Sequence, residues 1–294
     1  LFSRTLPVTS AITAWGSPMA TWQNIGETSN KGYEIQLSTV NVKSRNFQWS
    51  SSISYTHNDE KIVDLPDGDL IAKKLFEGHP IKTFYDFKYA GIWSTAEEEE
   101  AAKYGCQPGY VKIETVEQFT TDENGNLVGD GGVHTYSNTR DLQILGSNVP
   151  DGILGVNNTF KYRDFDLSVF AIVRYGQMID SKTIGWYSAN GNNQPRGTNY
   201  WTPENQSAYF PRPGIASTTG IGSLKYIDGS YAKIKNITLG YTFPKKLCKT
   251  LGLEQCRLYA TAYNVFVLPF KSELKHSDPE NNGSDTFPLY KTYL

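Results

Sequence analysis

Apolar and polar residues alternate along two neighbouring segments, 31–39 and 46–58. The first has one apolar face, formed by Tyr33, Ile35 and Leu37. The second has an apolar face of Phe47, Trp49, Ile53 and Tyr55, with serine and glutamine between them. A two-residue period predicts β-strands with one apolar and one polar face. A soluble sandwich and a membrane barrel both fit this pattern, since the polar face meets water in each.

The lengths of the connections separate these two folds. Further strands are predicted at 152–162, 165–175, 229–243, 256–266 and 289–294. Short turns at 40–45, 163–164 and 244–255 then alternate with long stretches at 59–151, 176–228 and 267–288. Outer-membrane barrels place short turns on the periplasmic side and long loops on the extracellular side. We therefore predict an all-β chain of antiparallel transmembrane β-barrel strands, with short periplasmic turns and long extracellular loops.

The amino-acid composition agrees with the wall of a β-barrel. The chain has 294 residues, of which 38% are hydrophobic and 13% aromatic, with 19 Tyr against 2 Met. A packed globular core would need more aliphatic side chains, usually about 45–50% apolar residues overall. No run approaches the ~20 apolar residues of a membrane-spanning helix, whereas a barrel strand crosses with only ~9–11 alternating residues. A formal net charge of -2 without clustered Lys and Arg argues against a nucleic-acid partner.

The sequence offers no positive case for an enzyme. The four histidines are isolated, and none has the spacing of a metal motif. We find no nucleophile elbow, P-loop or dinucleotide fingerprint, and we predict no catalytic residue, metal or cofactor. Cys248 and Cys256 flank a short turn, which leaves open whether they form a disulfide or are two small buried side chains.

Five stretches, in order and over nearly the whole chain, resemble signature segments of the SusC/RagA-like TonB-dependent outer-membrane transporters. They are residues 24–35 (NIGETSNKGYEI), 89–93 (YAGIW), 200–205 (YWTPEN), 231–241 (YAKIKNITLGY) and 259–266 (YATAYNVF). The resemblance implies that residues 1–294 are the C-terminal portion of a barrel, with about seven of roughly 22 strands. Nothing in the chain resembles the plug domain that family members carry near the N-terminus.

What the family does supplies further expectations. The resemblance implies TonB-dependent import of oligosaccharides or peptides across the outer membrane of a Gram-negative cell. Expected partners are a SusD-like surface lipoprotein, the TonB–ExbB–ExbD complex acting through the absent N-terminal part, outer-membrane lipids, and a glycan or peptide ligand.

Four aromatic residues of the second long loop are the candidates for ligand or partner contact: Trp186, Tyr187, Tyr200 and Trp201. Aromatic faces stack on sugar rings, but packing within the loop is an equal alternative for these side chains. Two other functions also stay open at this point. One is a soluble β-sandwich that binds glycans, and the other is a surface adhesin anchored by a barrel.

Overall fold

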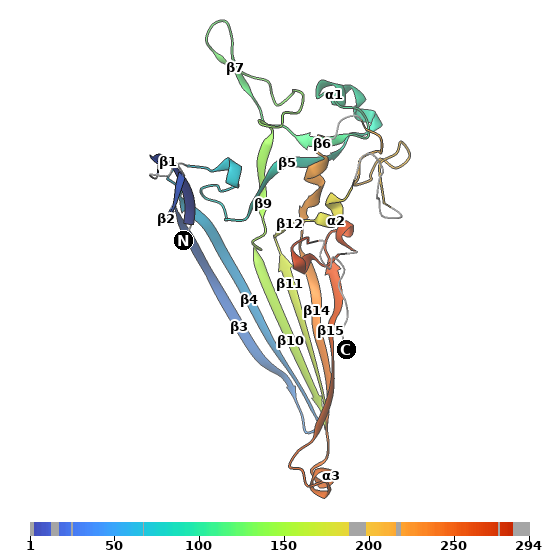
Figure 1. Ribbon diagram of the computed structural model, residues 1–294. Helices are drawn as coiled ribbons and strands as arrows, with labels where there is room; N and C mark the ends of the chain where they lie inside the picture. The colour runs from blue at the N-terminus through green and yellow to red at the C-terminus, as the bar shows by residue number, and fades with distance from the viewer. Residues whose placement is uncertain are drawn as a thin grey trace.

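A tilted, six-stranded antiparallel sheet dominates the computed structural model (Figure 1). The structure describes residues 3–12, 18–24, 26–66, 68–187, 198–215, 219–275 and 277–284. The strand order in the large sheet is β15–β14–β11–β10–β4–β3. The bounds of these strands are β3 Glu27–Lys43, β4 Phe47–Asp64, β10 Gly152–Tyr162, β11 Phe165–Tyr175, β14 Tyr231–Thr242 and β15 Arg257–Pro269.

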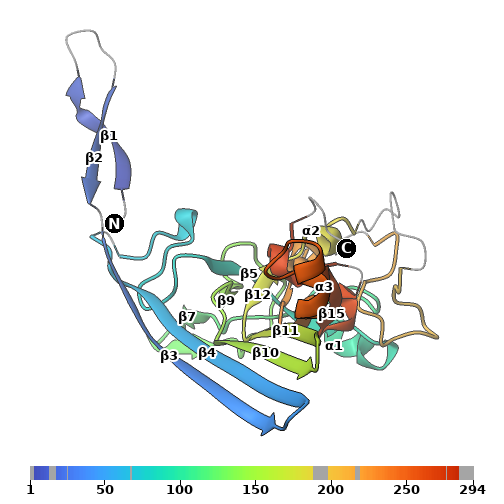
Figure 2. The ribbon, with the colours of Figure 1, turned by 90° about the horizontal axis from the view of Figure 1, so that it is seen from below.

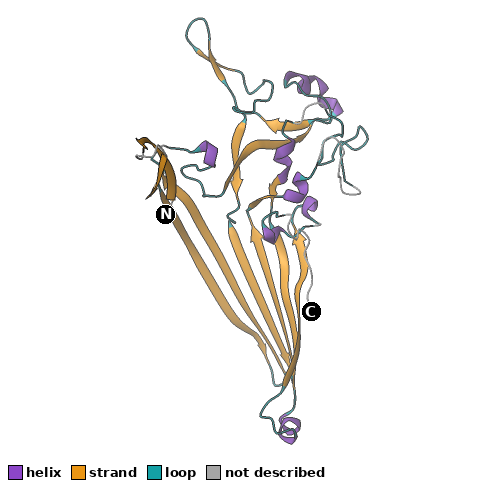
Figure 3. Cartoon of the chain, in the orientation of Figure 1, coloured by secondary structure: helices purple, strands orange, loops and turns teal. Residues whose placement is uncertain are grey.

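The remaining elements are short and lie mostly at one end of the sheet (Figure 3). Strands β1 (Ser3–Ile12) and β2 (Pro18–Asn24) form a separate hairpin. The other strands are β5 Thr83–Ile92, β6 Val111–Glu114, β7 Phe119–Thr121, β8 Leu127–Gly129, β9 Leu142–Ser147, β12 Met178–Asp180 and β13 Tyr226–Asp228. The α-helices are α1 Glu98–Lys103, α2 Lys182–Gly185 and α3 Lys245–Thr250. The 3-10 helices are η1 Ile71–Lys73, η2 Thr95–Glu97, η3 Ile221–Lys225, η4 Ser272–Leu274 and η5 Pro279–Asn281. Among the described residues, no helix has the length and apolar character needed to cross a membrane.

One face of the large sheet is mainly apolar from strand to strand. Residues directly opposite each other in a ladder share a face, so the register identifies which side chains form a row. One row crosses five strands and consists of Trp49, Phe160, Leu167, Leu239 and Ala260. A second row consists of Leu37, Ile53, Val156, Ala171, Ile234 and Phe266. Between these rows the same face also carries Thr39, Ser51 and Asn158, and the Ser51 hydroxyl donates to Asn158 Oδ1 at 2.7 Å. The face is therefore mainly apolar, with one polar patch whose groups bond to one another.

Aromatic side chains bound the apolar face at both ends. At the short-turn end, Phe47, Tyr162, Phe165 and Tyr241 are opposite one another on four successive strands. At the other end, the Tyr33 and Tyr55 rings lie 6.0 Å apart, and the Tyr55 and Tyr175 hydroxyls are 2.8 Å apart. From residue 165 to residue 175 the strand covers about 33 Å, or about 25 Å along the membrane normal at a tilt of roughly 40°. That span matches the apolar band of an outer-membrane barrel.

The opposite face of the same strands is polar. One row of hydroxyl side chains crosses five strands and consists of Ser50, Thr159, Ser168, Thr238 and Thr261. The hydroxyls of Thr238 and Thr261 are 2.9 Å apart, within hydrogen-bond distance. Figure 2 shows the sheet bent into an arc, with the segments from the long connections projecting over its concave side. We assign the polar face to this concave side, because Lys233 on that face is covered by the loop that contains η5.

A β-sandwich would cover the apolar face with a second sheet, and the described residues contain no such layer. Tyr33, Ile35 and Leu37 are 53%, 60% and 56% exposed, although each is large and apolar. The three hydrophobic clusters of buried residues all lie outside the large sheet. The exposed face therefore fits contact with lipid, and the soluble sandwich is excluded as the fold.

The long connections are folded rather than irregular. Within residues 59–151, β4 continues to Asp64, and β5 to β9 and α1 follow. Trp93, Ala101, Cys106, Tyr110 and Ile215 form one buried cluster that joins two of these connections. Ile179, Ile184, Leu224, Ile227 and Leu274 form another, which also involves the third connection. Together they make a cap with hydrophobic cores of its own.

Two further expectations concern the end of the chain and its cysteines. The predicted strand at 289–294 lies outside the described residues. Cys248 and Cys256 are free thiols, and Cys248 is the buried residue of α3, with its Sγ 3.7 Å from the Phe243 carbonyl oxygen. The disulfide alternative is therefore not seen.

Candidate functional site

An open groove of about 630 Å³ lies in the cap. Its walls come from two of the long connections, residues 95–108 and 200–213. The lining combines an aromatic side, two charges of opposite sign and several neutral polar groups: Thr95, Glu98, Gln107, Pro108, Tyr200, Trp201, Thr202, Pro203, Arg212 and Pro213. Ligand sites commonly combine an apolar surface with a few polar groups that fix orientation.

Close packing around a glycine brings the two walls of the groove together. Gly109 has φ of +86°, and a Cβ built on it would lie 2.7 Å from Arg212 Cδ and 2.9 Å from Trp201 Cε3. The Arg212 amide donates to the Gly109 carbonyl at 3.0 Å. Arg212 Nη2 donates to Gln107 Oε1 at 3.2 Å, and its guanidinium lies 5.5 Å from the centre of the Tyr110 ring. Arg212 is thus held in place on one side of the groove.

Hydrogen bonds to the start of α1 fix the other edge. The Thr95 amide donates to Gln206 Oε1 at 2.9 Å, and Gln206 Nε2 donates to the Pro203 carbonyl at 2.9 Å. Glu97 accepts from the Ser94 amide at 3.1 Å and pairs with Lys112 at 2.7 Å. The hydrogen bond from Lys112, followed by that from the Ser94 backbone, lowers the pKa of Glu97 to about 2. The edge of the groove therefore keeps its ion pair throughout the physiological pH range.

The structure separates the four aromatic candidates. Tyr200 and Trp201 both line the groove, with Tyr200 44% exposed and Trp201 3% exposed. Trp186 is 51% exposed but does not line this groove. Tyr187 is buried: its ring stacks on Phe210 at 4.6 Å, and its hydroxyl donates to the Pro211 carbonyl at 2.5 Å. Tyr200 is therefore the candidate best placed for contact, and Tyr187 packs within the loop.

The third connection folds over the polar face of the barrel wall. Lys233 Nζ pairs with Asp278 at 2.6 Å and with Glu280 at 2.5 Å, and Lys235 also pairs with Glu280, at 2.5 Å. Burial alone would raise the pKa of Glu280, but the bonds from Lys233 and Lys235 outweigh it and lower the pKa. These ion pairs fix η5 against the polar face of the sheet.

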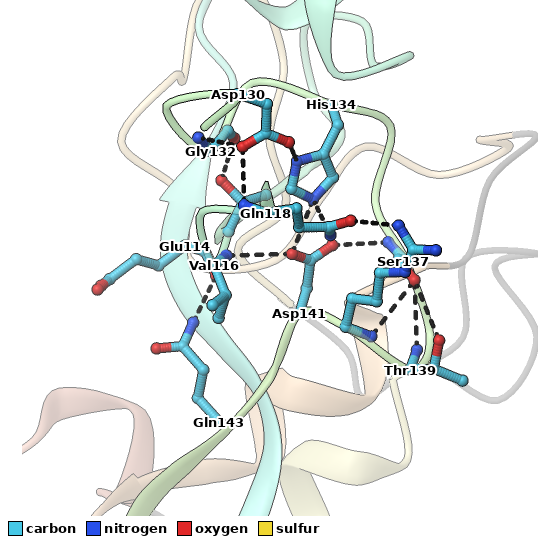
Figure 4. A network of polar contacts seen from close by, with 12 residues as sticks. Glu114, Val116, Gln118, Asp130, Gly132, His134, Ser137, Thr139, Asp141 and Gln143 are labelled. Carbon is cyan, nitrogen blue, oxygen red and sulfur yellow. Dashed lines mark hydrogen bonds and ion pairs between the residues drawn. The ribbon is translucent and has the colours of Figure 1, made fainter. Parts of the chain in front are cut away.

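A second polar network organises the loop around β7 and β8 (Figure 4). His134 lies between two carboxylates, with Nδ1 2.7 Å from Asp130 and Nε2 2.9 Å from Asp141. Asp141 is fully buried and also accepts from the amides of Val116 and Ser137. Burial alone would lower the pKa of His134, but the bonds to Asp141 and Asp130 outweigh it and raise the pKa. The network stabilises the loop, because each of these side chains is engaged in hydrogen bonds or ion pairs within it.

Sequence reasoning missed the polar members of both arrangements. Arg212 and Gln107 come from different walls of the groove and are joined by a hydrogen bond, although they are far apart in the chain and neither belongs to a motif. His134 was expected to be isolated, yet Asp130 and Asp141 lie close to it in sequence and could have indicated an ion pair. Within the part of the chain that the structure describes, no group of three or more His, Cys, Asp or Glu side chains is arranged to hold a metal ion.

No protein-family model matches the chain. In sequence it is similar to TonB-dependent receptor P3 of Formosa agariphila, at 29% identity over 96% of this chain and 27% of that receptor. TonB-dependent receptor P26 of the same organism is 30% identical over 89% of this chain and 26% of its own length. TonB-dependent receptor SusC of Bacteroides thetaiotaomicron is 26% identical over 92% of this chain and 26% of its own length. The chain thus spans about a quarter of the curated relatives it matches.

Solved structures show the same fold. The RagAB peptide transporter superposes with a TM-score of 0.69 at 20% identity, covering 93% of this chain and 29% of that chain. The RagAB peptide importer in its "open-open" state gives a TM-score of 0.68 at 18% identity, covering 99% of this chain and 30% of that chain. At such identities the likeness concerns the fold alone.

Sequence and fold agree on one class of protein. The relatives are named as receptors and the structural neighbours as transporters, so the prediction of a protein that is not an enzyme is confirmed. The predicted fold class and the resemblance stated from the five motifs are confirmed as well. Over about a quarter of their length, TonB-dependent receptors including SusC are similar in sequence to this chain, and its antiparallel β-strands have the fold of the matching part of the RagAB structures.

Proposed function

We propose that this chain forms the wall and the extracellular mouth of a barrel that imports oligosaccharides or peptides across the outer membrane. The observation that carries the proposal is the two-faced sheet. One face is mainly apolar between two aromatic boundaries, and the other presents hydroxyl and amide groups on the concave side of the sheet. A polar interior suits the passage of solutes that form many hydrogen bonds, such as sugars and peptide backbones.

The proposal includes an orientation and three partners. The long connections 59–151, 176–228 and 267–288 face the outside, and the short turns face the periplasm. A SusD-like lipoprotein covers the cap, TonB–ExbB–ExbD supplies energy, and outer-membrane lipids contact the apolar face. The names of the relatives support these partners, because they are TonB-dependent receptors and the RagAB peptide transporter.

Within the cap, Tyr200 and Trp201 are proposed to contact the ligand or the lid through the groove. The exposed Tyr200 ring and the adjacent prolines offer a surface for a sugar ring or a peptide side chain. Arg212 and Glu98 add charges of opposite sign, which a zwitterionic or hydrogen-bonding ligand can satisfy. The name of RagAB favours peptides, whereas the aromatic surface serves both classes.

The test uses the full-length protein with a double substitution, Y200A and R212A. Removing an exposed aromatic and an arginine from a contact surface costs about 1–2 kcal/mol each, so binding is expected to weaken by a factor of tens or more. Uptake of labelled oligosaccharides and labelled peptides is measured in cells with and without TonB. W186A is the matched control, because it removes an equally exposed aromatic from outside the groove.

Three results would count against the proposal or a part of it. Uptake that is the same with and without TonB would contradict the transport function itself. Normal TonB-dependent uptake by the double variant would contradict only the role of the groove. Cell-surface binding without any TonB-dependent uptake would favour the barrel-anchored adhesin instead.

A further inference from the structure

The turn between β14 and β15 differs from the other short turns of the sheet. It contains α3 and extends beyond the ends of the strands, on the side opposite the cap (Figure 1). The hairpin between β10 and β11, by comparison, closes with two residues, Arg163 and Asp164. A two-residue hairpin would have closed this ladder too, so the larger turn needs a reason other than strand connection.

The larger turn exposes three leucines that its own fold does not use. Leu247, Leu251 and Leu253 are 46%, 63% and 45% exposed. The buried side chain of α3 is instead Cys248, at 1% exposure. Backbone bonds close the segment around it, including one from the Leu253 amide to the Cys248 carbonyl at 2.9 Å. An exposed apolar surface on so small a unit indicates contact with another apolar phase or partner.

Positive charge lies beside these leucines. The segment from Pro244 to Gln255 contains three lysines and one glutamate. Lys245 and Lys249 line a cavity of about 710 Å³, together with Thr242, Phe243, Gly252, Leu253, Glu254 and Gln255. This lining places two ammonium groups next to a phenyl ring and a leucine side chain. Such a combination matches a phosphate group attached to an acyl chain.

The cavity is continuous with the lipid-facing surface. The Phe243 ring, which lines the cavity, packs edge-on against Tyr241 at 5.1 Å. Tyr241 in turn contacts Phe165 at 4.7 Å, and both belong to the aromatic row that bounds the apolar face. The cavity therefore opens at the level where the headgroups of the adjoining lipid leaflet lie.

We propose that the α3 turn is a binding site for anionic phospholipid of the periplasmic leaflet. Lys245 and Lys249 bind the headgroup phosphate, and Phe243, Leu251 and Leu253 contact the upper acyl chain. Lys246 adds long-range attraction to the same leaflet. The inference rests on the proposed function through one element, namely that the short turns face the periplasm. The bound lipid would fix how deeply the barrel sits in the membrane on the side of the α3 turn.

The test measures lipid binding to the full-length protein in detergent by native mass spectrometry. The probes are phosphatidylglycerol, phosphatidylcholine with the same acyl chains, and inorganic phosphate. The test variant is K245Q with K249Q, and the control is K73Q with K271Q, which removes two exposed lysines from the cap side. Heat-modifiable migration on a gel verifies that each barrel is folded.

We expect the wild-type protein to prefer phosphatidylglycerol and the control to match it. Each lysine removed from an anionic headgroup weakens binding by about fivefold, so the test variant should bind phosphatidylglycerol roughly 25-fold more weakly. Its binding of phosphatidylcholine should not change. L251S with L253S should weaken the binding of both lipids, because the acyl-chain contact is lost.

Three outcomes would overturn the inference. They are equal binding of the two lipids by the wild-type protein, unchanged binding by the lysine variant, and complete displacement of lipid by inorganic phosphate. None of these depends on uptake. A protein that lacks TonB-dependent uptake but keeps the lipid preference would refute the proposed function and leave this site standing.

Discussion

Substituting neighbouring residues in the middle of β10 tests which face of the wall meets lipid. Val156 lies on the apolar face between Ile53 and Ala171, and Asn157 lies on the polar face between Ser52 and Phe170. Both positions are near the centre of the strand, so they share membrane depth and strand environment. The pair V156R and N157R therefore introduces the same charge at the same depth on opposite faces.

The two substitutions should differ in cost by a predictable amount. An arginine facing lipid near the membrane midplane destabilises a barrel by about 2–4 kcal/mol. At position 157 the arginine enters a groove of about 330 Å³ lined mainly by serines and threonines. The main loss there is the hydrogen bond from Ser168 Oγ to Asn157 Oδ1, which is 3.1 Å long and contributes about 1 kcal/mol. The difference of roughly 2 kcal/mol corresponds to about 30-fold in the folding equilibrium.

The assay is reversible urea unfolding of the full-length protein in liposomes, with the unfolding midpoint and slope measured for each variant. V156R should unfold at clearly lower urea than N157R, with unchanged slope. A conservative pair, V156A and N157A, controls for loss of the native side chain. Equal costs for the two arginines, or a larger cost at position 157, would refute the assignment of faces.

Two further predictions concern the cap. His134 has a raised pKa in the folded loop, so its ion pairs with Asp130 and Asp141 stabilise the loop fully below the unfolded pKa of 6.5. This stabilisation is lost as pH rises through the higher pKa of the folded state. Hydrogen-exchange protection of residues 116–141 should therefore fall over that interval in the wild type and stay constant in H134Q. G109V should force Arg212 away from residue 109, because the new side chain would overlap it; thermal unfolding of the cap should occur several degrees lower, and an unchanged transition would contradict the packing described around the groove.

Local signals accounted for the central hairpin. The predicted bounds 152–162 and 165–175 coincide with β10 and β11, because strand-like runs on both sides of a two-residue turn are readable in sequence. Arg163 has φ of +52°, a left-handed conformation that such a turn requires.

Bulges and charged residues limited the prediction of the first strands. The segment predicted at 31–39 stops where the β3–β4 ladder shifts register between Val40 and Val42. A bulge breaks the two-residue period, although the strand itself continues to Lys43. The end of β4 is rich in charged residues and was assigned to a loop. The β3–β4 ladder nevertheless continues there, with Asp59 opposite Lys31 beyond the aromatic boundary. The β1–β2 hairpin was not among the predicted strands.

The cap and its groove could not be predicted from local pattern. Its strands β6, β7 and β8 are only three or four residues long, which is too short to show a clear two-residue period in sequence. The motif YWTPEN located Tyr200 and Trp201, but nothing near Arg212 or Gln107 indicated that they complete the same groove. The pairing of the strands decides which long connections become neighbours in space. No local sequence pattern shows which of them will touch.

The central claim is that one face of these strands stands in hydrocarbon and the other in an aqueous interior. The most direct measurement is a spin-label scan along residues 153–160 of the full-length protein in liposomes, after replacement of the three native cysteines by serine. Power saturation compares collision with oxygen, which partitions into lipid, and with a water-soluble nickel complex. The account predicts strict alternation, with positions 154, 156, 158 and 160 accessible to oxygen and positions 153, 155, 157 and 159 accessible to nickel. Uniform accessibility to nickel on both faces, or alternation in the opposite sense, would contradict it.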